Sequence, residues 1–153
     1  MSRSELGDFC SIVCFKAAIV GMEDALGEKA TAIALTTAGR SRGKNLAKDL
    51  GLTGVNADWD LIRDKIGFAL GANGTKLCKI EKIVEEDKLI KVSTSETLGS
   101  AGEVEGSSRK CTFTLGAVWG ALEEITGKRL RGSHTESLLR GGNYDVFEFS
   151  PLV

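Results

Sequence analysis

The hydrophobic pattern of this chain changes period at one glycine-containing segment, Gly71-Ala72-Asn73-Gly74. Before this segment, apolar residues recur at the three- and four-residue intervals of amphipathic helices. Directly after it, residues 78–84 alternate in the manner of a strand, and a turn and a second strand follow. One more helical stretch and two more strands complete the chain. We therefore expect an α/β (α+β) fold in which helices pack on a four-stranded antiparallel sheet.

Local signals place the boundaries of these elements. The spacing Ser2-Arg3-Ser4-Glu5 is that of a capping box, which predicts that the first helix starts here and ends near Gly27. The second helix is expected over 28–50, with its all-apolar centre 32–35 buried, and Asn56 is expected to cap the third. The remaining expected elements are strands at 78–84 and 89–93, a polar loop at 96–108, a helix at 110–126, and strands at 129–138 and 144–149.

Composition narrows the class of protein. The chain has 153 residues, of which 42% are hydrophobic and 27% charged, as in one globular domain over 1–153. A net charge of −1 lacks the excess of basic residues that is typical of nucleic-acid-binding domains. No apolar run in the sequence is long enough to cross a membrane. No signal peptide is evident, so we expect a cytoplasmic protein with reduced thiols at all four cysteines, Cys10, Cys14, Cys78 and Cys111.

One segment resembles a phosphate-binding loop. Residues 38–45 read Ala-Gly-Arg-Ser-Arg-Gly-Lys-Asn, but such a loop needs glycine where Ala38 stands and a hydroxyl where Asn45 stands. The segment is also expected to lie inside a helix. We therefore interpret Gly39 and Gly43 as a small helix face that lets another helix or chain approach. Arg40, Arg42 and Lys44 are expected to form a solvated face, and the alternative is that they contact an anion.

Two further patterns admit a structural explanation. Cys10 and Cys14 share a helix face and could begin a metal site, but their apolar neighbours favour buried, inert thiols. Gly116 and Gly120, with Ala117 and Ala121, indicate tight packing of the fourth helix. No catalytic signature surrounds any cysteine or His134, the single histidine, so an enzyme is the less favoured hypothesis.

The last third of the chain carries a family pattern. It begins with Cys111-Thr112-Phe113-Thr114-Leu115-Gly116 and Gly120, continues through Gly127, Glu136 and Gly142, and ends with Phe147-Glu148-Phe149. This pattern resembles the 4-vinyl reductase domain family, also described as hydrocarbon-binding proteins. The first half is similar as well, in its long first helix and in Ala38-Gly39-Arg40 followed by Gly43.

The resemblance implies a fold shared with the vesicle-tethering subunits of the transport protein particle. In that fold, helices and an antiparallel sheet enclose an apolar cavity, and the domain often forms a homodimer. Members act as sensory ligand-binding domains or as accessory proteins in tetrapyrrole metabolism. No nicotinamide or flavin site is recognisable in this chain, so we expect no cofactor.

Several members of the family hold zinc through one glutamate and three cysteines. Cys111 and Glu136 stand at two of those positions, whereas the other two fall near Leu139 and Phe147, which cannot bind metal. We therefore expect no zinc, with apolar packing in its place. In phenol-sensing members the residue two before that glutamate lines the cavity, which implies the same for His134. Alternation on a strand would point His134 and Glu136 to the same side.

These observations favour a non-catalytic module that binds an apolar or aromatic small molecule. The expected ligand-binding residues are His134, Trp119, Phe113 and Leu122, with residues 96–108 as a lid. The alternatives are a structural interaction subunit of the vesicle-tethering type and an accessory protein of tetrapyrrole metabolism. A homodimer is expected, with the Gly39 and Gly43 face as one reason for it.

Overall fold

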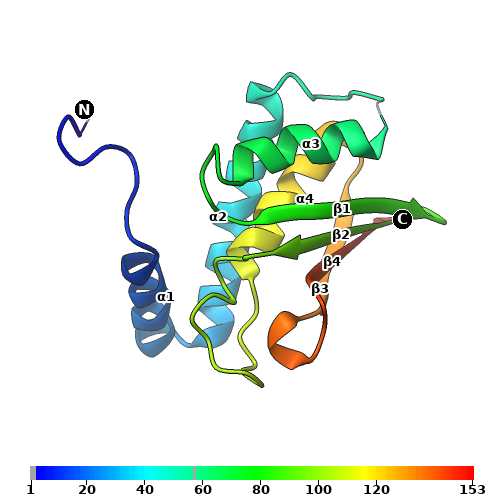
Figure 1. Cartoon of the computed structure of the whole chain (residues 1–153). Helices are drawn as coiled ribbons and strands as arrows, with labels where there is room; N and C mark the ends of the chain where they lie inside the picture. The colour runs from blue at the N-terminus through cyan, green and yellow to red at the C-terminus, as the bar shows by residue number, and fades with distance from the viewer. Residues whose placement is uncertain (1–2, 57) are drawn as a thin grey trace.

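The computed structural model describes residues 3–56 and 58–153, and its elements follow the expected order (Figure 1). The elements are α1 (Ile12–Leu26), α2 (Glu28–Asp49), α3 (Trp59–Leu70), β1 (Lys79–Glu86), β2 (Leu89–Ser95), α4 (Thr112–Thr126), β3 (Leu130–Glu136), a short 3-10 helix η1 (Leu138–Arg140) and β4 (Asp145–Pro151). All pairings in the sheet are antiparallel, and the strand order is β1-β2-β4-β3. The expected α+β fold is thereby confirmed.

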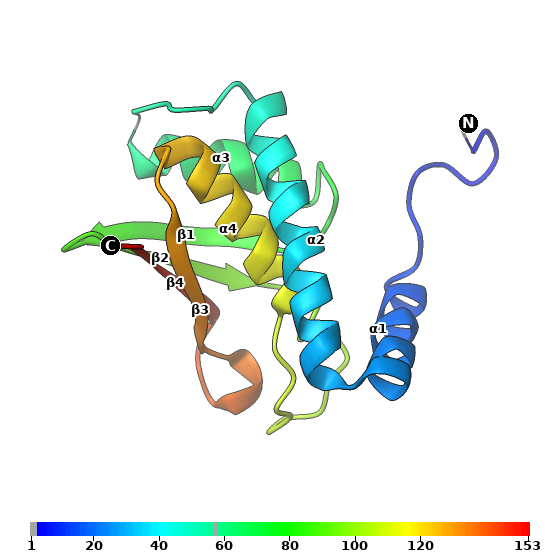
Figure 2. The same ribbon diagram turned by 180° about the vertical axis from the view of Figure 1, so that it is seen from behind.

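Helices α2 and α4 cross in close contact (Figure 2). A Cβ atom added to Gly43 would lie 1.8 Å from the Ala117 carbonyl oxygen, and one added to Gly120 would lie 2.0 Å from the Arg40 carbonyl oxygen. The two small-residue motifs therefore pack against each other within one chain. This explains Gly39 and Gly43 structurally and removes them as a reason to expect a dimer, because both are buried.

The hydrophobic core lies between α4 and the sheet. Helix α4 buries Val118, Leu122 and Ile125 in the same cluster as Phe147 and Phe149 of β4. Helix α3 covers β1, and Gly67 of α3 faces Ile80 of β1. Strand β4 is central and its burial is nearly continuous, so side chains on both of its faces are enclosed.

Some boundaries differ from the sequence prediction. Helix α1 begins at Ile12, because the Ser11 hydroxyl accepts a hydrogen bond from the Val13 N–H and caps it there. Ser2, on which the predicted capping box depends, lies outside the described residues. Helix α3 is capped by Asp58 instead of Asn56, since the Asp58 carboxylate accepts from the Leu61 N–H.

Helix α1 stands apart from the sheet and leans on the first turns of α2 (Figures 1 and 2). Ile19 is its one buried residue, and Cys10 and Cys14 are exposed. The prediction that these two thiols are buried is wrong, and the prediction that residues 32–35 at the centre of α2 are buried holds for Leu35 but not for Ile33 and Ala34, which are exposed. Ile33 is 60% exposed because α4 covers only one face of α2.

Within residues 3–56 and 58–153, the search for a helix with the length and apolarity to cross a bilayer found none.

Candidate functional site

A cavity of about 500 Å³ opens between α1, the first turns of α2, and the segment that joins β2 to α4. Its position follows from the fold, because α1 is held away from α4 by the width of α2 (Figure 2). Apolar side chains supply much of the wall: Ile19, Ala32, Leu35, Leu98 and Phe113. Polar side chains, among them Glu23, Lys29 and Arg109, line the rest of the wall, so a concave site of this size suits a small organic molecule with both an apolar body and polar groups.

One polar group buried at the wall of this cavity lacks a partner. The Thr31 hydroxyl is buried and forms no hydrogen bond with any described residue, and Thr31 lines the cavity. Buried hydroxyls are normally paired, since an unpaired one loses its hydration without compensation. The Thr31 hydroxyl is therefore an unpaired polar group buried at the cavity wall.

Ion pairs tie α1 to the connecting segment at the cavity rim. Lys16 donates to the Gly99 carbonyl oxygen at 2.8 Å and pairs with Glu103. Arg109 pairs with Glu23 of α1 at 2.9 Å and with Glu103 at 2.6 Å. The hydrogen bond from Lys16 is the main reason that the pKa of Glu103 is lowered. Residues 96–108, the expected lid, are thus fastened to α1 by charge.

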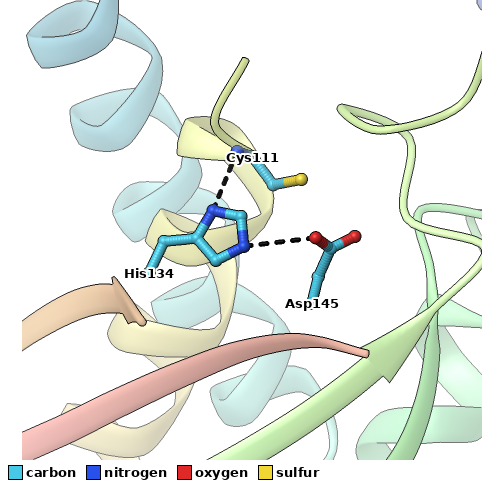
Figure 3. Close-up of side chains that lie close together, drawn as sticks. All are labelled: Cys111, His134 and Asp145. Carbon is cyan, nitrogen blue, oxygen red and sulfur yellow. Dashed lines mark hydrogen bonds and ion pairs between the residues drawn. The ribbon is translucent and has the colours of Figure 1, made fainter. Parts of the chain in front are cut away.

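A buried polar cluster adjoins the cavity through Cys111, and Figure 3 shows its three side chains. It contains Cys111 at the start of α4, His134 on β3 and Asp145 at the start of β4, and Cys111 also lines the cavity. The imidazole Nε2 lies 3.2 Å from Asp145 Oδ1, and the Cys111 N–H donates to Nδ1 at 3.5 Å. The side chains of His134 and Asp145 are 2% and 0% exposed. Three elements therefore bring three chemically different donor atoms together away from solvent.

Hydrogen bonds hold Asp145 in its charged form. Burial by itself would raise the pKa of this carboxyl, but hydrogen bonds from His134 and from the Ser100 hydroxyl outweigh burial and lower it. The Leu138 N–H also donates to the same carboxylate. Burial raises the pKa of the Cys111 thiol to about 12 and that of the neighbouring Cys78 thiol to about 12. The cluster thus combines one buried carboxylate with protonated thiols.

The expected relation between His134 and Glu136 is wrong. The pairing of β3 with β4 shifts register between these residues, so a bulge at Thr135 interrupts the alternation. As a result the His134 side chain is buried and Glu136 is exposed. Leu139 and Phe147 are buried and carry no donor. The ligand set that the family resemblance implies for zinc therefore does not fit this chain.

The structure separates the four predicted ligand-binding residues. Phe113 lines the cavity, and His134 lies behind Cys111 with its ring 5.0 Å from that of Phe147. Trp119 instead donates to the Leu130 carbonyl oxygen at 3.0 Å and lies under the Arg40 guanidinium. Leu122 is wholly buried in the core, because it lies on the face of α4 that meets the sheet.

Sequence reasoning missed Thr31 and Asp145. Asp145 carried a usable signal, since it is an acidic residue that leads directly into the apolar stretch Val146-Phe147 after a glycine-rich turn. Thr31 carried no such signal in the sequence, because threonine is common near the start of a helix. Its importance comes from the cavity, which forms only when α1 folds back beside α2.

Comparisons with known proteins identify the fold. No protein-family model and no curated protein sequence matches this chain. Solved structures do match, and one of them is the phenol-responsive sensory domain of the transcription activator PoxR, solved with phenol. The match has a TM-score of 0.75 at 10% sequence identity and covers 94% of this chain and 76% of that domain. At this identity the likeness establishes the shared fold.

Proposed function

We propose that residues 1–153 form one cytoplasmic domain that binds an apolar or aromatic small molecule in the cavity beside α1, as a sensory or regulatory module without catalysis. The observation that carries this proposal is a cavity of about 500 Å³ whose wall combines apolar and polar side chains, with the unpaired Thr31 hydroxyl buried at that wall. Such a site selects a ligand with an apolar body and one hydrogen-bonding group, as a phenol has.

Two further observations support this function. The Phe113 ring packs edge-on against Phe15 of α1 with centroids 5.6 Å apart, which gives the cavity an aromatic wall that spans α1 and α4. The PoxR domain with the same fold is described as phenol-responsive and was solved with phenol. Within the expected set we assign direct ligand contact to Phe113 and a positioning role to His134, which acts through Cys111. Trp119 and Leu122 fix α4 in the core.

Ligand binding can be tested with matched cavity variants. Ala32 lines the cavity, whereas Ala34, on the same helix, is exposed. We expect phenol to stabilise the wild type and Ala34→Trp in a thermal-shift titration, and not Ala32→Trp, whose side chain would fill the cavity. Equal stabilisation of both variants, or none of the wild type by phenol, toluene or 1-naphthol, would remove this cavity as the ligand site.

We also propose that the domain is a homodimer, as members of the 4-vinyl reductase family often are, and that α1 forms the interface. One face of α1 turns Phe15 and Ile19 toward the chain, while Val13, Ala17 and Val20 on the rest of its surface are exposed. Exposed apolar surface of this kind often marks a protein–protein contact, and a second copy of the chain is the commonest partner.

Light scattering provides the test of the dimer. The wild type should show twice the monomer mass of 16.3 kDa, and Val13→Glu should show the monomer mass. Ile33→Glu, a change of equally exposed apolar surface on α2, serves as the control. A monomeric wild type at micromolar concentration would refute the proposal.

A further inference from the structure

A second cavity, of about 330 Å³, opens at the other end of α4 from the cavity beside α1. Its inner wall rests on Ile62, Ile90 and Ile125, which belong to the hydrophobic core. Its outer wall comes from the segment before α3, the turn between β1 and β2, and the segment between α4 and β3. Helix α4 has 15 residues, so its length separates the two cavities by about 20 Å. They share no lining residue and are therefore separate sites.

The outer wall of this second cavity carries an excess of positive charge. Lys88 and Lys128 are exposed and line it, and neither ammonium forms an ion pair with a carboxylate of residues 3–56 or 58–153. The described lining residues include one carboxylate, Glu85, whose Oε2 already accepts a hydrogen bond from the Trp59 indole at 2.8 Å. A neutral ligand that covered the two lysines would remove them from water without a counter-charge, which is unfavourable. The charges at this wall therefore favour an anion.

Lys88 stands in a backbone conformation that lysine rarely adopts. Asp87 and Lys88 are the central residues of the turn between β1 and β2, with φ of 50° and 67°. Aspartate tolerates this left-handed region, but glycine is strongly preferred at the second central position of such a turn. Glycine at position 88 would relieve the strain and would also remove the ammonium from the cavity. The strain is thus a separate indication that the side chain of Lys88 has a role there.

We propose that this second cavity binds a small aromatic carboxylate, whose charged group pairs with Lys88 and Lys128 and whose ring lies against Trp59. The indole of Trp59 is half-buried and is held by its hydrogen bond to Glu85, so it presents a fixed aromatic surface. Asn56 and Thr126 contribute an amide and a hydroxyl to the same lining, and both groups can donate hydrogen bonds to a carboxylate. The volume lies at the lower end of the ~300–1,000 Å³ that is usual for small-molecule sites.

Benzoate binding can be followed at the Trp59 indole by NMR of the isotope-labelled full chain. The chain has two tryptophans, and Trp119→Phe assigns which indole N–H resonance belongs to Trp59. We expect benzoate to shift the Trp59 resonance to saturation. Benzamide, a neutral compound of nearly the same shape, should bind roughly 10-fold more weakly because it lacks the charge. The shift should persist in Ala32→Trp, in which the cavity beside α1 is filled.

Lysine variants separate the charge of the site from the strain of the turn. Lys88→Gly should weaken benzoate roughly 3–10-fold, because one partly solvated ion pair is lost. The same change should raise the Tm by about 2–4 °C, because it removes a strained left-handed residue. Lys128→Ala should weaken benzoate to a similar extent. Lys76→Gly is the matched control, since Lys76 also has positive φ, 56°, but does not line this cavity, and its benzoate affinity should be unchanged.

The outcomes of these titrations distinguish this site from the cavity beside α1. A wild type without a saturable Trp59 shift, or with equal affinity for benzoate and benzamide, would overturn the proposal. Full benzoate affinity in both Lys88→Gly and Lys128→Ala would also overturn it. If that affinity were lost in Ala32→Trp, the anion would belong to the cavity beside α1. Phenol stabilisation that depends on Ala32 is a separate result, so the proposed function and this second site can fail independently.

Discussion

Replacing Thr31 by valine should make the ligand-free protein more stable and the phenol complex weaker. Valine has nearly the same shape as threonine, so the change removes the hydroxyl and leaves the packing of α2 intact. The Thr31 residue is 2% exposed and its hydroxyl forms no hydrogen bond in the described residues. An unsatisfied buried polar group costs about 1–3 kcal/mol. The free energy of unfolding should therefore rise by about 1 kcal/mol, which corresponds to a Tm increase of about 2–4 °C for a chain of this size.

The effect on binding should have the opposite sign. A phenol hydroxyl that pairs with Thr31 gains a net hydrogen bond of about 0.5–1.5 kcal/mol, so its affinity should fall by roughly 2–12-fold in Thr31→Val. Toluene, which lacks the hydroxyl, should bind both proteins alike. Urea unfolding with and without each compound measures both quantities in one experiment.

Thr37→Val is the matched control on the same helix. The Thr37 hydroxyl is exposed and already donates to the Ile33 carbonyl oxygen at 2.8 Å, so its removal should leave stability within about 0.5 kcal/mol and phenol affinity unchanged. A Thr31→Val protein that is less stable by 1 kcal/mol or more, with undiminished affinity for phenol, would refute the reasoning. It would mean that the hydroxyl stabilises the fold through its own hydrogen bond.

Three other predictions follow from the packing and the ion pairs. Gly43→Ala should destabilise the fold by about 2 kcal/mol or more in urea unfolding, because its Cβ would overlap the Ala117 carbonyl, whereas Gly21→Ala, with open space around it, should stabilise α1 by about 0.5–1 kcal/mol. Hydrogen bonds from Leu130 and Arg40 outweigh burial and lower the pKa of Glu123, so its stabilisation should be present above about pH 4 and lost as the pH falls further. The pH profile of Glu123→Gln should therefore be flatter in acid than that of Glu124→Gln, and equal profiles would contradict this. Lys16→Met should speed hydrogen exchange over 99–103, because it removes the bonds to Gly99 and Glu103, while Lys29→Met should not.

The sequence alone determined the order of elements, because that order is written in local periodicity. Helical spacing before Gly71 and alternation after Gly74 needed no tertiary information. The Asp87-Lys88 turn between β1 and β2 was equally local, because it separates two alternating stretches of sequence, and in the structure both residues adopt positive φ. The sequence also indicated tight packing at Gly39, Gly43, Gly116 and Gly120, although it did not show that these two faces meet each other.

Only the tertiary structure decided which side chains form the site. Cys111, His134 and Asp145 come from three elements, and their convergence depends on the register of β3 against β4. A single bulge moved Glu136 to the surface, and no periodicity in the sequence announces a one-residue bulge. The cavity likewise depends on where α1 comes to rest, and helical spacing defines the faces of α1 without stating which of them meets α2. Local sequence patterns therefore determine where the helices and strands lie, whereas contacts between residues far apart in the sequence determine which side chains meet in the cluster and the cavity.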